Sequence, residues 1–413
     1  MGTGVSAPKG VLLYGPPGTG KTMLAKATAT ASDVTFISAV GSQFIKSLHG
    51  QGKDMLLDMF RTARKYAPSI IFIDEIDTIA RTRTGSNNSV GVEDILTALL
   101  AEMDGFKSNS SKPVFVLAAT NYDPAATGEK SLDPAVLRRF DRRIFVDLPN
   151  RDERKKYLLR RIGENAIFSV SEEKIDNIAM RSTGMSLAQL ASVIELAMRT
   201  AIKDGDLKVT DAILDESFEE FNSGEKKTWN DDLLIRVARH EAGHAFLCWQ
   251  SGETPSYLTI VARGSHGGYM QHEDNEGKAL YSRKELRDRI RISLGGRASE
   301  IVYYGAEDGV STGASGDLQS ATALARSMIC EYGMSERFGL AAIGIDPTAF
   351  RDVAAEIYRE INAILSEELE KAIAILSANQ AAINAIVDEL MIKNHLTGDE
   401  INAVFEKHAV QVD

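Results

Sequence analysis

The sequence of 413 residues is long enough for two or three domains, each able to bury a hydrophobic core of its own. Hydrophobic residues make up 44% and charged residues 25% of it, which is typical of folded globular proteins rather than of disordered chains. The formal net charge of −11 argues against a general polyanion-binding protein, so we expect no nucleic acid partner.

The first 150 residues alternate between short apolar runs and amphipathic stretches. The apolar runs predict buried strands at 10–14, 34–37, 69–73, 114–119 and 143–148, and the spacing of apolar residues predicts helices at Thr22–Ala31, Asp54–Tyr66 and Val92–Asp104. This alternation is typical of a parallel sheet covered by helices. We therefore expect an α/β domain over residues 1–150.

A glycine-rich stretch, GPPGTGKT, lies directly between the first predicted strand and the first predicted helix. It fits the pattern G-x-x-x-x-G-K-[ST], in which backbone N–H groups and a helix N-terminus surround the phosphates of a nucleotide. Lys21 is expected to reach the β- and γ-phosphates, and Thr22 to ligate Mg²⁺. The predicted ATP-binding residues are Gly15, Pro16, Pro17, Gly18, Thr19, Gly20, Lys21 and Thr22, together with Asp74.

Polar residues end two further predicted strands. Asp74 and Glu75 follow an apolar run in IIFIDEID, and Asn121 ends VLAATN. Asp74 would hold Mg²⁺ through water, Glu75 would polarise the attacking water, and Asn121 would orient that water or sense the γ-phosphate. Taken alone, such residues are more often a solvated turn. After a phosphate-binding loop they indicate ATP hydrolysis, and their spacing resembles that of the AAA+ ATPases.

The resemblance extends to the stretch LDPAVLRRFDRR at 132–143. In AAA+ proteins, two arginines of this region reach the nucleotide of the neighbouring subunit, and the resemblance assigns that role to Arg139 and Arg142. Because four arginines occur within six residues, surface ion pairs are the alternative interpretation. Arginines that act between subunits imply a ring.

Beyond residue 150 the pattern changes from mixed to helical. Residues 151–222 have purely helical periodicity and predict a helical lid, and the polar stretch 223–232 predicts a linker. Residues 233–413 predict a mainly helical second domain. Its exceptions are a predicted strand at Tyr257–Arg263 and a Gly-rich loop at Gly305–Gly316. The strand could align a substrate peptide by edge addition, and an ordinary sheet edge is the alternative.

The second domain contains the stretch HEAGHAFLCWQ. His240 and His244 are four residues apart on a predicted helix, so their side chains share one face and can hold one metal ion. Glu241 points about 100° away from His240 and would take a proton from a water that zinc activates. An exposed helix whose histidines form ion pairs is the alternative. Cys248 lies one turn beyond His244 and is expected in the core.

A catalytic zinc site needs a third protein ligand. Asp317, at the start of a predicted helix in STGASGDLQSAT, is a candidate, although an ordinary acid in a first helical turn explains the same spacing. The order of the ATPase motifs, HEAGHA, GGRASEIVYYG and STGASGDLQSAT is similar to that of the FtsH family of ATP-dependent zinc metalloproteases, from about Pro8 to Ile401. The resemblance makes Asp317 the third zinc ligand.

The resemblance implies an ATP-dependent zinc endopeptidase that unfolds, translocates and degrades proteins as a hexameric ring, with one Zn²⁺ per subunit, ATP and Mg²⁺. It also implies membrane-protein quality control in a longer form with a membrane segment. An ATP-driven unfoldase with a structural or inactive zinc helix is the alternative, because Leu48, His49 and Gly50 stand where the family has an aromatic pore-loop residue. A nucleotide-gated binding scaffold is a third interpretation.

Gly316, the residue directly before Asp317, stands where the family generally has Asn.

Two further features bear on the compartment. Cys248 and Cys330 both lie in helical patterns, which argues against a disulfide framework and favours a reducing, cytosol- or matrix-like compartment. The longest apolar runs are much shorter than the ~20 residues that cross a bilayer, so the sequence as given reads as soluble. Membrane attachment would depend on segments outside this sequence.

Overall fold

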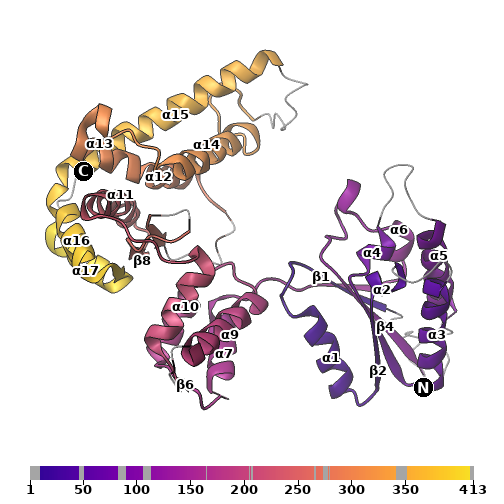
Figure 1. The fold of residues 1–413 in the computed structure, drawn as a ribbon. Coiled ribbons are helices and arrows are strands. Elements are labelled where there is room, and N and C mark those ends of the chain that lie inside the picture. Colours follow the sequence, from indigo (N-terminus) through magenta and orange to yellow (C-terminus); the bar gives the residue numbers. More distant parts are fainter. Residues whose placement is uncertain are drawn as a thin grey trace, which may run out of the picture. The chain divides into compact units, whose positions relative to one another are not determined.

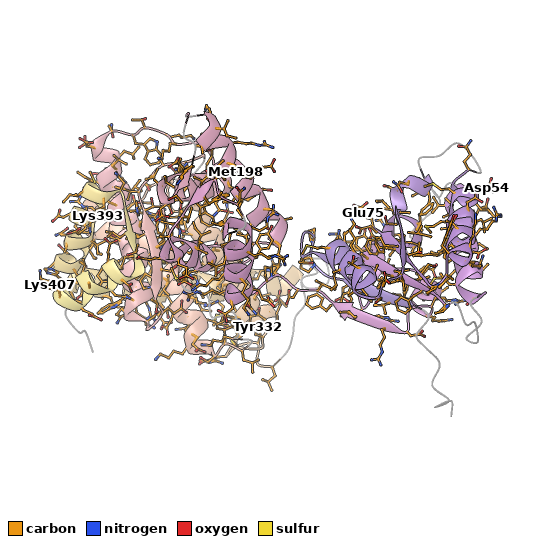
Figure 2. All side chains as sticks on the ribbon, turned by 90° about the horizontal axis from the view of Figure 1, so that it is seen from below. Asp54, Glu75, Met198, Tyr332, Lys393 and Lys407 are labelled. Atoms are coloured by element: carbon orange, nitrogen blue, oxygen red, sulfur yellow. The ribbon has the colours of Figure 1, made fainter. Side chains whose placement is uncertain are left out.

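The computed structural model describes residues 10–45, 51–81, 90–105, 113–163, 165–203, 205, 208–264, 267–272, 278, 280–340 and 351–409. The chain forms two compact units, the first made of residues 1–157 and 184–192 and the second of residues 158–183 and 193–413. Each unit packs its own side chains: Asp54 and Glu75 belong to the first unit, and Met198, Tyr332, Lys393 and Lys407 belong to the second (Figure 2).

The first unit is built on a parallel sheet of five strands in the order β2-β3-β4-β1-β5. The three inner strands, β1, β3 and β4, are apolar and largely buried, as parallel strands covered on both faces require, whereas the edge strands β2 and β5 are mostly exposed or half-buried. The bounds are β1 Gly10–Tyr14, β2 Thr35–Val40, β3 Ser69–Asp74, β4 Val114–Thr120 and β5 Arg142–Phe145. The five strands predicted from the sequence are present, with ends that differ by up to three residues. The expectation that all five are buried was wrong, because β2 and β5 lie at the edges of the sheet.

Helices cover both faces of this sheet (Figure 1). Along β3, Ile71 and Ile73 join the core on one face, whereas Ile70 and Phe72 join the core on the other, because successive side chains of a strand alternate. The second face is covered by α1 Lys21–Ala31, and the first by α2 Gly41–Ile45, α3 Gln51–Lys65, α4 Asp77–Ala80, α5 Val90–Asp104 and α6 Pro134–Leu137. A short 3₁₀ helix lies at Gly128–Lys130.

Within its described residues, the region predicted as a helical lid contains four helices and one short pair of strands. The helices are α7 Arg151–Gly163, α8 Glu172–Arg181, α9 Leu187–Lys203 and α10 Asp211–Ser223. The expectation of a purely helical region was wrong, because β6 Phe168–Ser169 pairs in parallel with β7 Val209–Thr210. These strands have two residues each, which is too short for a period-2 pattern to stand out in the sequence.

The remainder of the chain is mainly helical, as predicted. The helices are α11 Asp231–Gln250, α12 Arg283–Ser293, α13 Gly295–Asp308, α14 Ser315–Cys330, α15 Arg351–Ala378, α16 Gln380–Lys393 and α17 Gly398–His408. A three-stranded antiparallel sheet has the order β10-β8-β9, with bounds β8 Pro255–Thr259, β9 Tyr269–His272 and β10 His395–Thr397. Among the described helices, none is both long and apolar enough to traverse a bilayer.

Two sequence expectations for this part need correction. The strand predicted at Tyr257–Arg263 is β8, which ends at Thr259 and lies in the middle of its sheet. Both of its edges are occupied, so it cannot take up a peptide by edge addition. The predicted loop at Gly305–Gly316 is shorter, because α13 reaches Asp308 and α14 begins at Ser315. Gly305, with a φ of 80°, kinks α13 without ending it.

Candidate nucleotide site and metal centre

The glycine-rich loop lies between β1 and α1. Gly18 has a φ of 75°, a conformation that favours glycine, and a Cβ at this position would lie 2.7 Å from Oγ of Ser186. Nζ of Lys21 donates hydrogen bonds to the carbonyl oxygens of Gly15 at 2.9 Å and Pro16 at 2.7 Å. Burial lowers the pKa of Lys21, and the charge of Asp74 opposes that shift only in part. The ammonium group is therefore held inside the loop.

The acidic pair lies at the carboxyl end of β3. Oγ1 of Thr22 donates a 2.5 Å hydrogen bond to Oδ2 of Asp74, so the two residues predicted to hold Mg²⁺ meet across 52 positions of sequence. Glu75 has a φ of 50°, which is uncommon for a residue with a side chain. Its N–H donates to Oδ1 of Asp74 at 2.9 Å, and its carbonyl accepts from Oγ1 of Thr78 at 2.8 Å. These bonds hold the strained backbone in place.

Asn121 directly follows β4. Because β4 lies between β3 and β1 in the sheet, Asn121 ends the strand between the one that carries Asp74 and the one that leads into the phosphate-binding loop. The carboxyl ends of parallel strands meet at one edge of the sheet. The three predicted elements of the nucleotide site therefore lie at the same edge.

The two predicted finger arginines have different surroundings. Nε and Nη2 of Arg139 donate to the carboxylate of Asp104 at 3.0 and 2.6 Å, which is the intrachain ion pair of the alternative interpretation. Arg142 begins β5 and is exposed. The structure does not bring these arginines together with the phosphate-binding loop. The predicted pore-loop positions Leu48, His49 and Gly50 lie outside the described residues.

The second candidate site is built around α11. The side chain of Asn230 caps the helix by accepting from the N–H of Leu233 at 3.0 Å. His240, Glu241 and His244 lie in the buried part of α11 and are 8%, 8% and 7% exposed. Cys248 is fully buried in the apolar core of this unit, where burial raises the pKa of its thiol. The alternative of an exposed helix whose histidines form ion pairs does not agree with this burial.

Asp317, in the first turn of α14, meets the two histidines. Its Oδ2 lies 3.2 Å from Nε2 of His240 and 3.5 Å from Nε2 of His244. The three ligand atoms lie within 4.8 Å of one another, although Asp317 is 73 residues after His244 in the sequence. The residues that the sequence singled out as a metal tripod are therefore brought together.

The Nδ1 atom of each histidine, on the side of the ring away from Asp317, contacts a further group that was not predicted from the sequence. Nδ1 of His244 donates to the carbonyl oxygen of Ile292 at 2.6 Å, and Nδ1 of His240 lies 2.8 Å from Oε1 of Glu300. A carbonyl oxygen can only accept, so the proton of a neutral His244 sits on Nδ1 and its Nε2 carries the lone pair. Glu300 lies in GGRASEIVYYG, and a carboxylate four residues after a glycine pair was its only signal.

The charges at this centre are coupled. Burial by itself would lower the pKa of His240, but hydrogen bonds to Asp317 and Glu300 outweigh burial and raise the pKa to about 10. The pKa of Asp317 is lowered, since the two histidines outweigh the opposing effect of burial. A negative carboxylate thus attracts positive charge to this point. A metal ion at this centre would compete with protons for the same nitrogen atoms.

The donor set fits a zinc ion. Atoms bound to one tetrahedral zinc at about 2.0–2.2 Å lie about 3.3–3.6 Å apart, and the two distances to Asp317 are close to this range. Two imidazole nitrogens and one carboxylate oxygen are ligands that zinc accepts, and three protein ligands leave a position open. The side chain of Asp317 is 32% exposed, so the centre can be reached from solvent.

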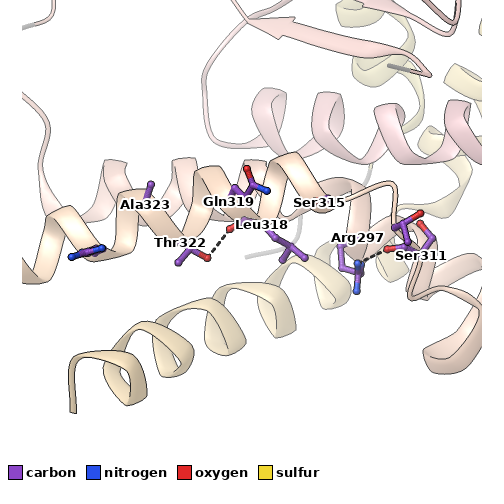
Figure 3. Close-up of a pocket in the computed structure, with 9 residues that line it drawn as sticks. Arg297, Ser311, Ser315, Leu318, Gln319, Thr322 and Ala323 are labelled. Carbon is purple, nitrogen blue, oxygen red and sulfur yellow. Dashed lines mark hydrogen bonds between the residues drawn. The ribbon is translucent and has the colours of Figure 1, made fainter. Parts of the chain in front are cut away.

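Two residues of α13 hold the segment that leads into α14. Nη2 of Arg297, on α13, donates to the carbonyl oxygen of Ser311 at 2.7 Å (Figure 3). Oγ of Ser311 donates to Oε1 of Glu300 at 3.0 Å. Glu300 therefore contacts both His240 and the segment that carries Asp317, and this links the ligands from two distant parts of the sequence.

Comparison with known families agrees with this division of the chain. Residues 11–148 match the ATPase family associated with various cellular activities (AAA), and residues 234–404 match peptidase family M41. The first match covers the sheet with the phosphate-binding loop, and the second covers α11 with the metal tripod. The parallel α/β fold and the mainly helical second region are thereby confirmed.

Relatives match nearly the whole chain. ATP-dependent zinc metalloprotease FtsH 3 of Sphaerobacter thermophilus is 36% identical over 97% of this chain and 81% of its own length. FtsH 1 of a Thermoanaerobacter species is 37% identical over 99% of this chain and 68% of its own length. FtsH of Akkermansia muciniphila is 35% identical over 98% of this chain and 51% of its own length. The chain thus spans about half the length of the Akkermansia relative and about two thirds or more of the other two. The similarity runs through both the nucleotide site and the metal centre, and the chain therefore belongs to the FtsH family.

Proposed function

We propose that this chain is an ATP-dependent zinc endopeptidase that degrades proteins. The observation that carries the proposal is the meeting of His240, His244 and Asp317 from two distant helices, with Glu241 on the same helix as the histidines. The relatives carry the name ATP-dependent zinc metalloprotease, which agrees with a metal centre and a nucleotide site in one chain.

In the ATPase half, each residue has a distinct task. Lys21 binds the β- and γ-phosphates, Thr22 and Asp74 hold Mg²⁺, and Glu75 orients and polarises the attacking water. The contact between Thr22 and Asp74 supports this assignment, as does the constrained backbone of Glu75. Asn121 orients the water or senses the γ-phosphate. Its place between the strands of the other two elements supports that role.

In the peptidase half, His240, His244 and Asp317 hold the ion. Zinc, when bound, supplies a Lewis acid that polarises a peptide carbonyl and lowers the pKa of water. Glu241 takes the proton of the attacking water and later donates it to the leaving amine. Glu300 and the carbonyl of Ile292 hold the two imidazoles in the orientation that presents Nε2 to the metal.

The proposal also includes a ring, because a folded protein cannot enter a protease site directly. In a hexamer, Arg139 or Arg142 of one subunit stabilises the charge on the nucleotide of its neighbour, and Arg139 must then release Asp104. Hydrolysis around the ring would pull unfolded substrate toward the zinc sites. Membrane-protein quality control, in a longer membrane-attached form, is the biological role that family membership favours.

Degradation of casein tests the proposal. We expect casein to be degraded with ATP, Mg²⁺ and zinc, and Glu241→Gln to abolish degradation while ATP turnover continues. Glu75→Gln should abolish both ATP turnover and ATP-driven degradation. Persistent ATP turnover with intact casein, unaffected by Glu241→Gln, would instead favour an unfoldase, and absence of ATP turnover would favour a binding scaffold.

A further inference from the structure

A positively charged side chain is completely buried at the end of α8, between the lid and the small sheet of the second unit. The side chain of Arg181 is 0% exposed. Its Nη1 donates to Oδ1 of Asp215 at 2.8 Å, and Nη2 donates to Oε1 of Glu219, both on α10. The guanidinium group stacks on the ring of Tyr257 in β8, 3.6 Å from the ring centroid. Arg181 therefore joins α8, α10 and β8.

Stability alone is a weak explanation for this arrangement. A buried ion pair recovers little more than the cost of removing its charges from water, and apolar side chains of similar volume often stabilise as well or better. Nε of Arg181 is also buried without a hydrogen bond partner, which adds a further cost. In some proteins a buried charged group of this kind specifies one geometry at the expense of stability.

The geometry that it specifies is that of β9, the edge strand of the small sheet. Oη of Tyr269 donates to Oε1 of Glu219 at 2.7 Å, so Glu219 accepts from both Arg181 and β9. Nε2 of Gln271 donates to the backbone carbonyl of Arg181 at 2.8 Å. Tyr269 and Gln271 are two residues apart and lie on the same face of the strand. That face is bound to the lid at two points.

The same strand begins beside the proposed general base. A Cβ on Gly268 would lie 3.2 Å from Cγ of Glu241 and 2.5 Å from the carbonyl oxygen of Thr259. The backbone at Gly268 therefore lies close to the side chain of Glu241, with no room for a side chain between them. A shift of β9 along or across the sheet would change the space around that carboxylate.

Arg181 also lies close in sequence to the nucleotide site. The chain passes from the second unit to the first between Thr183 and Gly184, directly after α8. Within the first unit, the N–H of Ala188 donates to the carbonyl oxygen of Gly18 in the phosphate-binding loop at 3.2 Å. Arg181, whose carbonyl contacts β9, and Ala188, whose N–H contacts the phosphate-binding loop, are thus seven positions apart in the sequence.

We propose that Arg181 and Glu219 are positioning residues, which transmit the nucleotide state of the ATPase to the peptidase centre through Tyr269, Gln271 and the edge strand β9. The inference rests on the proposed function. In this arrangement, nucleotide exchange changes the rate of peptide-bond cleavage itself, besides driving substrate movement.

The test uses a short fluorogenic peptide, which needs no unfolding, and the full chain with zinc and Mg²⁺ in the presence of either ATP or ADP. Tyr269→Phe removes one hydroxyl and keeps the ring. Tyr303→Phe is the matched control, because Oη of Tyr303 donates a 2.8 Å hydrogen bond to Asn384 in the same unit, away from β9. Arg181→Met removes the central charge as a second variant.

We expect the wild type to cleave the peptide with different kcat/KM in ATP and in ADP, and Tyr269→Phe to reduce this difference about 3- to 10-fold, the effect of one lost hydrogen bond. ATP turnover should be unchanged, and Tyr303→Phe should keep the nucleotide difference. Equal behaviour of Tyr269→Phe and Tyr303→Phe in both nucleotides would overturn the inference.

Hydrogen exchange of the β9 amides separates failure of the inference from failure of the proposed function, because it requires no cleavage. We expect ATP and ADP to give different protection at Tyr269–His272 in the wild type, and Tyr269→Phe and Arg181→Met to remove the difference. Nucleotide-sensitive protection without peptide cleavage would contradict only the peptidase activity. Protection that is indifferent to nucleotide would refute the coupling even if the peptide is cleaved.

Discussion

Glu300 is 2% exposed, and its carboxylate joins three parts of the metal centre. It lies 2.8 Å from Nδ1 of His240, accepts from Oγ of Ser311, and pairs with Arg236 through Nε at 2.7 Å. The arginine and His240 together keep the pKa of Glu300 below its usual value, against the opposing effect of burial. An ionised carboxylate at this position can hold the imidazole of His240 in one orientation.

We predict that Glu300→Gln lowers zinc affinity about 10- to 100-fold, the usual effect of removing a group that orients a metal-bound histidine. The amide keeps the shape of the side chain but loses its charge, so His240 and Arg236 are held less firmly. Competition with a fluorescent zinc chelator measures the change. Glu307→Gln, at an exposed position of the same helix, is the control, and equal affinity of the two variants would contradict the prediction.

At the scale of elements, the metal centre depends on a close approach of α11 and α13. A Cβ on Gly243 would lie 2.5 Å from the carbonyl oxygen of Gly295, and a Cβ on Gly296 would lie 2.1 Å from Nε2 of His240. Gly243 and Gly296 do not have left-handed backbones. These positions therefore require glycine because no side chain fits there, and not because of its backbone freedom. The glycines bring Glu300 within reach of His240.

We predict that Gly243→Ala destabilises the second unit by about 1–3 kcal/mol, because the new methyl group meets backbone atoms that cannot move independently. Gly316→Ala is the control. A Cβ there has no heavy atom within 4 Å, and we expect a change within about 0.5 kcal/mol. Urea unfolding followed by tryptophan fluorescence reports this unit, since Trp229 and Trp249 both belong to it. Equal midpoints for the two variants would show that α11 and α13 can separate without cost.

At the scale of the whole molecule, the chain divides into two units with separate cores, and each carries one candidate ligand site. The phosphate-binding loop belongs to the first unit and the tripod to the second. A ligand that binds only the folded state stabilises the structure that forms its site.

We predict two unfolding transitions in calorimetry. Zinc should raise the midpoint temperature of the transition that tryptophan fluorescence follows, and ATP with Mg²⁺ should raise mainly the midpoint of the other transition. At a hundred times its dissociation constant, each ligand should add about 2.7 kcal/mol to the free energy of unfolding of the unit that binds it. Removal of zinc by a chelator should abolish proteolysis and leave ATP turnover. A single transition that both ligands shift equally would mean that the two units unfold as one.

Features that depend on neighbouring residues could be predicted from the sequence. The phosphate-binding loop, the helix with His240 and His244, and the five parallel strands follow from local spacing and from apolar periodicity, because these set which side chains share a face. The short strands β6 and β7 and the true end of β8 could not be predicted, since two to five residues carry too little pattern.

By itself, the sequence determined which groups could perform chemistry: a loop for phosphates, an acidic pair, two histidines one turn apart and a glutamate between them. Only the tertiary structure decided which distant groups join them. It brought Asp317 and Glu300 to the histidines, placed β8 in the middle of its sheet, paired Arg139 with Asp104 and buried Arg181 against β8. Contacts across many tens of residues depend on how helices and strands pack, and that packing leaves no fixed spacing in the chain.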